Sequence, residues 1–162
     1  MTDEKDSFEF WKGKWQFQIG QCRILVHSTD TETFYKKQPT ITDNCNCGDC
    51  KYYSEVVIRQ ENRLFELLKK MKVDLNRQPN INPDGICCID LDDGRKGYIG
   101  YYYVIGVLGK TSKKTKVVDE SGNVIEVSFK DAEFGKGIDL TIKQVAADKL
   151  SFEFYLEVDG SS

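Results

Sequence analysis

The sequence predicts an α+β fold in which a curved antiparallel sheet packs on one long amphipathic helix. Three observations predict this fold class. One segment has apolar residues at helical spacing, the second half of the chain alternates apolar and polar residues, and turn residues separate the alternating segments. No internal repeat, Gly/Ser linker or Pro-rich stretch divides the 162 residues. We therefore expect a single domain over residues 1–162, with a flexible segment at residues 1–7.

The first elements are expected to be two strands. Residues 16–27 are rich in β-forming side chains and are followed by a polar run at residues 28–31, which is typical of a strand that ends in a turn. A second strand over residues 33–37, ending near Pro39, would complete a hairpin with the first.

The strongest helical pattern lies at residues 48–72. Apolar residues recur there at intervals of three and four, and the same face is interrupted only by the polar pair at residues 60–61. The apolar positions are Tyr53, Val56, Val57, Leu64, Leu67, Leu68 and Met71. Asn44 or Asn46 is expected to cap the start of this helix, and Asp49 in its first turn complements the positive end of the helix dipole.

From residue 86 onward the pattern predicts antiparallel strands joined by tight turns. Turn residues at 92–97 and at 119–122 each separate two β-rich segments. The last pair of strands is the clearest, because apolar and polar residues alternate over 138–143 and 150–158. Residues 74–85, with two prolines and three asparagines, are expected to form the loop between the helix and these strands.

The charge balance argues against two kinds of partner. The chain has 23 lysines and arginines against 26 aspartates and glutamates, a formal net charge of -3. This balance disfavours dedicated nucleic-acid binding and a polybasic membrane anchor. The first residues contain acids and lysines and no long apolar run, so neither a secretory signal nor a transmembrane helix is expected. We expect a cytoplasmic protein with no nucleic-acid and no membrane partner.

The most concentrated chemical feature is the motif N-C-N-C-G-D-C. Its cysteines, Cys45, Cys47 and Cys50, lie immediately before and within the first turn of the expected helix, and we call them the cysteine cluster. Backbone amides without partners and the helix dipole lower the pKa of a thiol at a helix N-terminus. The thiolate is the form that binds metal or attacks a disulfide, so the motif favours chemistry that a buried cysteine does not.

The first interpretation of the cysteine cluster is a structural zinc site, with zinc as the expected cofactor. Structural zinc takes four ligands in a tetrahedron, so one more ligand must come from elsewhere in the chain. We expect Cys87 to be the fourth ligand, with Cys88 or His27 as the alternative. Because neighbouring residues in a strand point to opposite faces, at most one of Cys87 and Cys88 should reach the site.

Two other interpretations of these cysteines stay open. The C-x-x-C at Cys47 and Cys50 opens a helix, as it does in thioredoxin-like disulfide oxidoreductases. In those enzymes, however, the helix follows a parallel strand, whereas the strands here are expected to pair as hairpins. The remaining interpretation is that the cysteines pack without a ligand, or cross-link only on oxidation.

The common hydrolase motifs are absent from the sequence. His27 is the only histidine, and there is no G-x-S-x-G and no H-E-x-x-H. We therefore expect a protein that binds another protein rather than one that catalyses a reaction. A small-molecule site between the expected helix and the tyrosine-rich strand at residues 98–103 is an alternative.

Residues 45–109 resemble a family of small uncharacterised bacterial proteins. The resemblance lies in the order of C-x-C-x-x-C, an amphipathic helix ending L-L-K-K-M-K-V-D, a Pro-containing loop, a D-G turn and the strand G-Y-Y-Y-V-I-G. Some such proteins are similar to immunity proteins that neutralise polymorphic toxins. The resemblance implies a bacterial protein that works by binding another protein, and it assigns no catalytic residue.

Overall fold

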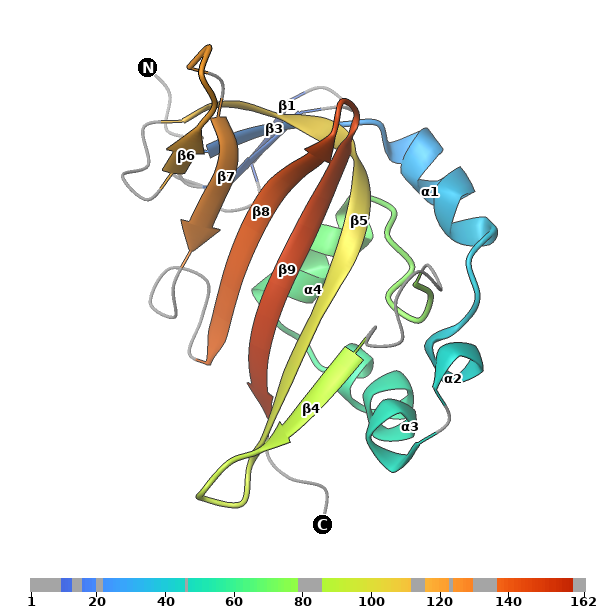
Figure 1. Ribbon diagram of the computed structural model, residues 1–162. Coiled ribbons are helices and arrows are strands. Elements are labelled where there is room, and N and C mark those ends of the chain that lie inside the picture. The colour runs from blue at the N-terminus through green and yellow to red at the C-terminus, as the bar shows by residue number, and fades with distance from the viewer. Residues whose placement is uncertain are drawn as a thin grey trace.

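The computed structural model describes eight stretches of the chain: residues 10–12, 16–19, 22–45, 47–78, 86–111, 116–122, 124–129 and 137–158. Within them the fold is α+β, with a curled antiparallel sheet and several short helices, as Figure 1 shows. The expected flexible segment at residues 1–7 and the second half of the expected loop lie outside these stretches. No helix in the described stretches combines the length and apolar character needed to cross a lipid bilayer.

The described strands form one sheet, in which every pair is antiparallel. The strands are β1 (Phe10–Lys12), β2 (Gln16–Ile19), β3 (Cys22–Val26), β4 (Ile86–Asp90), β5 (Lys96–Thr111), β6 (Lys116–Val118), β7 (Val124–Phe129), β8 (Ile138–Ala146) and β9 (Lys149–Val158). Their order is β1-β2-β3-β5-β9-β8-β7-β6, and β4 pairs with β5 beside β3. The long strand β5 therefore connects the two halves of the sheet.

The hairpins expected in the second half of the chain are confirmed. β4 pairs with β5, β6 with β7, and β8 with β9. The first two turns contain Gly94 and Gly122, whose φ angles of 85° and 86° lie in the left-handed region that glycine adopts without steric cost. The alternation over residues 150–158 is also confirmed, because the apolar side chains of β9 are buried on one face.

The single long helix expected over residues 48–72 is wrong. The segment forms three pieces: α3 (Gly48–Glu55), the short 3-10 helix η2 (Val57–Arg59) and α4 (Arg63–Lys70). The backbone departs from helical geometry at Val56 and is extended at Gln60. Three consecutive β-branched residues at 56–58 weaken the helix, and Asn62 starts a new one by accepting a hydrogen bond from the Phe65 amide at 2.7 Å. The sheet thus packs on short helices.

The strand expected over residues 33–37 is also wrong. Residues 28–31 begin the helix α1 (Ser28–Lys36) instead of forming a turn, and the short helix α2 (Ile41–Asn44) follows it. Thr31 and Tyr35 are four residues apart and both are buried, so one face of α1 packs against the sheet. Tertiary contacts of these two side chains decide the conformation, which local β-propensity did not predict.

Helix α4 ends in a Schellman motif. The amide of Val73 donates to the carbonyl of Leu68, and the amide of Lys72 donates to the carbonyl of Lys69, both at 3.0 Å. Lys72 has a φ of 72°, the left-handed conformation for which glycine is the usual residue. The motif turns the chain sharply, so the residues after α4 run beneath the middle of β5.

The middle of β5 has an edge that no strand covers. β4 pairs with β5 as far as Gly100, and β3 pairs with it from Gly106 onward. The hydroxyl of Tyr35 lies in this gap, where it donates to the carbonyl of Tyr103 and accepts from the amide of the same residue, both at 2.8 Å. One side chain of α1 therefore makes the two hydrogen bonds that a neighbouring strand would make.

Two more buried polar side chains complete this edge. The Thr31 hydroxyl accepts from the amide of Ile105 at 3.0 Å, and the side-chain amide of Gln78 donates to the carbonyl of Tyr101 at 2.6 Å. Thr31 and Gln78 are 0% and 1% exposed, so their polar groups need these partners. Together with Tyr35 they hold α1 and the chain after α4 against β5.

The inner face of the curled sheet is filled by aromatic rings. The Tyr53 hydroxyl lies 2.7 Å from that of Tyr102, which in turn donates to the carbonyl of Leu75 at 2.6 Å. Because a tyrosine has one hydroxyl proton, Tyr53 must be the donor in the first bond. The rings of Tyr102 and Phe154 stack with their centroids 5.7 Å apart. These buried rings pack α3 against β5 and β9.

Removing the Tyr35 hydroxyl tests the role of this gap. We expect Tyr35→Phe to lower the free energy of unfolding by about 2 kcal/mol, because it leaves two buried backbone groups of β5 without a partner. The matched control is Tyr101→Phe. The Tyr101 hydroxyl makes no hydrogen bond among the described residues, so its removal should lower the free energy of unfolding by less than about 0.5 kcal/mol. Chemical denaturation of both variants measures the difference, and equal losses would contradict the expectation.

Candidate metal centre

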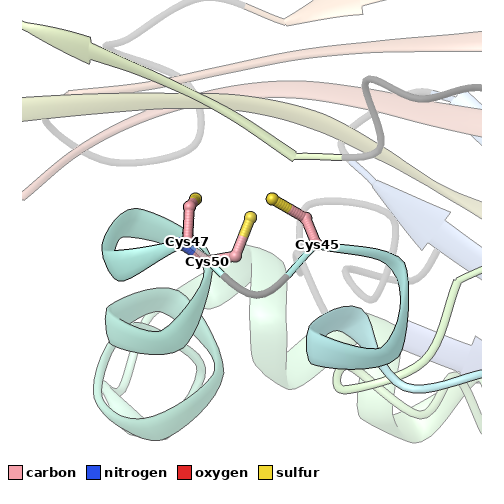
Figure 2. A group of neighbouring side chains, drawn as sticks. All are labelled: Cys45, Cys47 and Cys50. Atoms are coloured by element: carbon pink, nitrogen blue, oxygen red, sulfur yellow. The ribbon is translucent and has the colours of Figure 1, made fainter.

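The cysteine cluster brings three sulfur atoms together at the corner between α2 and α3. Cys45 follows the last residue of α2, Cys47 is the N-cap of α3, and Cys50 lies in the first turn of α3. The three Sγ atoms all lie within 4.8 Å of one another. Figure 2 shows the three side chains pointing to the same side of the corner. The sequence spacing predicted this cluster correctly.

Local hydrogen bonds form the corner. A capping box between Thr40 and Asp43 starts α2, and the amide of Cys45 donates to the carbonyl of Ile41 to close it. The amide of Ile41 donates to the carbonyl of Asn76 at 2.9 Å, which ties α2 to the chain after α4. The backbone is then extended at Cys45, so the chain turns and starts a second helix within a few residues.

The cap of α3 differs from the expectation. The sulfur of Cys47 accepts the amide proton of Cys50 at 3.4 Å, so a cysteine takes the role that we expected for Asn44 or Asn46. Asn46 and the side chain of Asn44 lie outside the described part of the structure. The cluster thus contributes a cap to the helix whose N-terminus it occupies.

The cysteines at the two ends of the C-x-x-C differ in exposure and in the direction in which their thiol pKa is shifted. The amide of Cys50 donates to the Cys47 sulfur and lowers the pKa of that exposed thiol, to which the Cys45 side chain also contributes. Burial raises the pKa of the Cys50 thiol well above its usual range, and the neighbouring cysteines raise it further. A metal cation at this place would offset the repulsion between three thiolates, since metal binding displaces thiol protons.

The cluster fits a zinc ion with little rearrangement. Zinc–sulfur bonds of about 2.3 Å in a tetrahedron place the sulfurs about 3.8 Å apart. The sulfurs here are already within 4.8 Å of one another, so closure needs movements of about 1 Å or less, which side-chain rotation supplies. Thiolate donors also suit copper(I). Structural zinc, however, takes four ligands in a tetrahedron, so three cysteines and a fourth would complete the coordination sphere of a zinc ion.

The register of β4 separates the two candidate fourth cysteines. Cys88 pairs with Tyr98, whose buried hydroxyl donates to the carbonyl of Asp49 in α3 at 3.3 Å. Cys88 therefore lies on the face of the sheet that meets α3, and it is half-buried. Cys87 pairs with Ile99, which is 43% exposed, and lies on the opposite face. Of the two neighbours, Cys88 therefore lies on the face of β4 that meets α3, and Cys87 lies on the other face.

His27 is far from the cluster. It follows Val26, which pairs with Gly106 of β5, whereas Cys88 pairs with Tyr98 of the same strand. The two positions on β5 are 106 − 98 = 8 residues apart. At about 3.3 Å per residue this separation is roughly 26 Å. His27 also is exposed and precedes α1, so the structure does not bring it to the cysteines.

An ion-pair bridge beside the cluster was not expected from the sequence. Lys96 lies 3.5 Å from the Asp49 carboxylate and 2.9 Å from that of Asp90, and so joins α3 to β4 and β5. Burial raises the pKa of the nearby Cys88 thiol, and the charge of Asp49 adds to this effect. No local signal could have revealed the bridge, because it depends on which residues of β4 and β5 pair.

Comparison with protein-family models, with curated proteins and with solved structures finds no match. The fold and the site nonetheless define a class: a curled antiparallel α+β protein with a three-cysteine cluster, able to hold a metal ion, at the corner between two helices. The resemblance to immunity-like bacterial proteins stays a prediction.

The lowered pKa of Cys47 predicts its reactivity in the metal-free, reduced protein. We expect iodoacetamide to alkylate Cys47 before Cys50. The alkylation rate of Cys47 should stay high as the pH falls below about 8.5, the ordinary pKa of a cysteine, because a lowered pKa keeps the thiolate populated there. Timed alkylation with peptide mass mapping measures each rate. A short unstructured peptide with one cysteine serves as the reference, so identical pH profiles for Cys47 and for this peptide would contradict the expectation.

Proposed function

We propose that this protein is a non-enzymatic, protein-binding domain in which the cysteine cluster holds one structural zinc ion. The convergence of three sulfurs within 4.8 Å is the observation that supports the zinc site. The corner between α2 and α3 is short, and hydrogen bonds from Ile41 to Asn76 and from Tyr98 to Asp49 join it to the rest of the fold. A zinc ion there would hold both helices in place and so fix the surface around them.

The fourth ligand in this proposal is Cys88. Its side of β4 faces α3, and Tyr98 and Lys96 already link that part of the sheet to Asp49, which lies between Cys47 and Cys50 in the chain. Four cysteine ligands close the coordination sphere and leave no position for water or substrate. The ion would therefore be structural, which agrees with a role in which the surface of the domain, and not the metal, meets the partner.

Thiol–disulfide exchange is the second candidate function. It is supported by the contrast between Cys47, exposed at the N-cap of α3, and Cys50, buried one turn later. In that reaction the Cys47 thiolate attacks a substrate disulfide, and Cys50 then attacks the mixed disulfide, so the substrate leaves as a dithiol and Cys47–Cys50 becomes a disulfide. The α3 helix, however, follows another helix and not a parallel strand, unlike the thioredoxin arrangement.

Metal titration of the reduced full-length protein tests the zinc proposal. We expect one zinc per chain by native mass spectrometry, and a thiolate-to-cobalt charge-transfer band on titration with Co²⁺. Cys50→Ser should abolish binding. Cys88→Ser should weaken it by about tenfold or more because it removes a ligand, whereas Cys87→Ser, the matched control on the opposite face, should leave it unchanged.

The outcomes separate the two candidate functions. A protein without zinc that rapidly reduces a model disulfide, and loses this activity in Cys47→Ser, would replace the zinc proposal with the redox one. Equal zinc affinity of the Cys88→Ser and Cys87→Ser variants would overturn the assignment of Cys88 while leaving the cluster as a metal site.

A further inference from the structure

A groove with excess positive charge runs beside α4, on residues that are separate from the cysteine cluster. It consists of two adjoining hollows of about 390 Å³ and 570 Å³, which share Lys69, Val73 and Asp74. The first hollow lies between α1 and the residues after α4, and the second continues toward η2. Because their linings share these three residues, the two hollows lie side by side, and we call them together the groove.

Five cations line this groove against two carboxylates. The cations are Lys36, Lys69, Lys72, Arg77 and Arg59, and the carboxylates are Glu32 and Asp74. Asp74 is already used within its own loop, where it accepts from the amide of Asn76 and pairs with Arg77 at 3.4 Å. The three lysines make no salt bridge within the described residues. The groove is thus positive in a chain whose net charge is -3.

The exposed lining of the groove is mainly polar in the first hollow and mainly apolar in the second. Val73 and Leu75 are each 5% exposed, and Ile58 is half-buried at the end of the second hollow. Lys72 stands at the rim in the left-handed conformation set by the Schellman motif, so its backbone position is fixed by two hydrogen bonds. The groove therefore combines cations in both hollows with apolar surface in the second.

We propose that this groove binds an acidic polypeptide segment of a partner protein. Carboxylates of the segment would meet Lys36, Lys69 and Lys72, and its apolar side chains would contact the second hollow. Two adjoining hollows, each lined by its own cations, suit a segment that spans both of them. The inference rests on the proposed role as a protein-binding domain but not on the zinc ion, and it names the surface and the chemistry of the partner.

The groove suits a polypeptide better than a nucleic acid. The carboxylates of Glu32 and Asp74 lie among the cations and would repel closely spaced phosphates. Base recognition also needs exposed aromatic rings on which bases stack, whereas the aromatic ring of the lining, Tyr35, is 1% exposed. A polypeptide can instead space its carboxylates so that they lie opposite the cations and away from Glu32 and Asp74, and it needs no aromatic ring to stack on.

Fluorescence anisotropy with a labelled ten-residue peptide of glutamate and leucine tests this proposal. We expect the full chain to bind the peptide at low ionic strength and to release it at about 1 M salt, where surface charges are screened. The double variant Lys69→Glu/Lys72→Glu should weaken binding by about tenfold or more. The matched control is Lys70→Glu, which changes charge on the same helix outside the groove lining and should weaken binding by less than about twofold.

A further variant separates binding from folding. Lys72→Gly removes one rim charge and places glycine at the left-handed position, so the protein should be at least as resistant to thermal unfolding as the original while binding the peptide more weakly. Absence of peptide binding by the original protein, equal losses for the Lys70→Glu and double variants, or tighter binding of a ten-nucleotide single-stranded DNA would each overturn the proposal. Zinc titration of the same samples shows separately whether the metal site stands, so failure of the groove and failure of the cluster are distinguishable.

Discussion

The unpaired stretch of edge in the middle of β5 is the constraint on which the rest of the structure depends. Strands β3 and β4 lie beside the same edge of β5, and between Gly100 and Gly106 this edge has no strand partner, whereas β9 pairs with the other edge. Buried amides and carbonyls cannot stay unpaired without a large loss of stability. Side chains must therefore take the place of a strand, and Tyr35, Thr31 and Gln78 do so.

These hydrogen bonds determine where the helices lie. Tyr35 and Thr31 hold α1 against β5, and Gln78 holds the chain that follows α4. That chain includes Leu75, whose carbonyl accepts the hydrogen bond from Tyr102, and so it is also connected to Tyr53 of α3. The hydrogen bonds to the backbone of β5 therefore determine both the groove between α1 and α4 and the position of α3 beneath β4.

The cysteine cluster lies at the end of this chain of contacts. Its three sulfurs come from a short stretch whose geometry is local, because the end of α2, the cap of α3 and the first turn of α3 follow one another directly. The relation of the cluster to β4 is not local. It depends on the pairing of Cys88 with Tyr98, and on the contacts of Tyr98 and Lys96 with Asp49.

Features that arise from neighbouring residues could be read directly from the chain. The hairpins after residue 86 and the alternation in β9 were predicted, because turn residues and period-two burial act over a few positions. The clustering of the three cysteines was predicted for the same reason. The break at Val56 also has a local cause, the β-branched run at residues 56–58 and the cap at Asn62, which the helical spacing of apolar residues did not reveal. The helical state of residues 28–36 and the faces of the sheet on which Cys87 and Cys88 lie were decided by the folded chain. Each depends on which distant backbone group or strand a residue meets, and that pairing exists only once the sheet has formed.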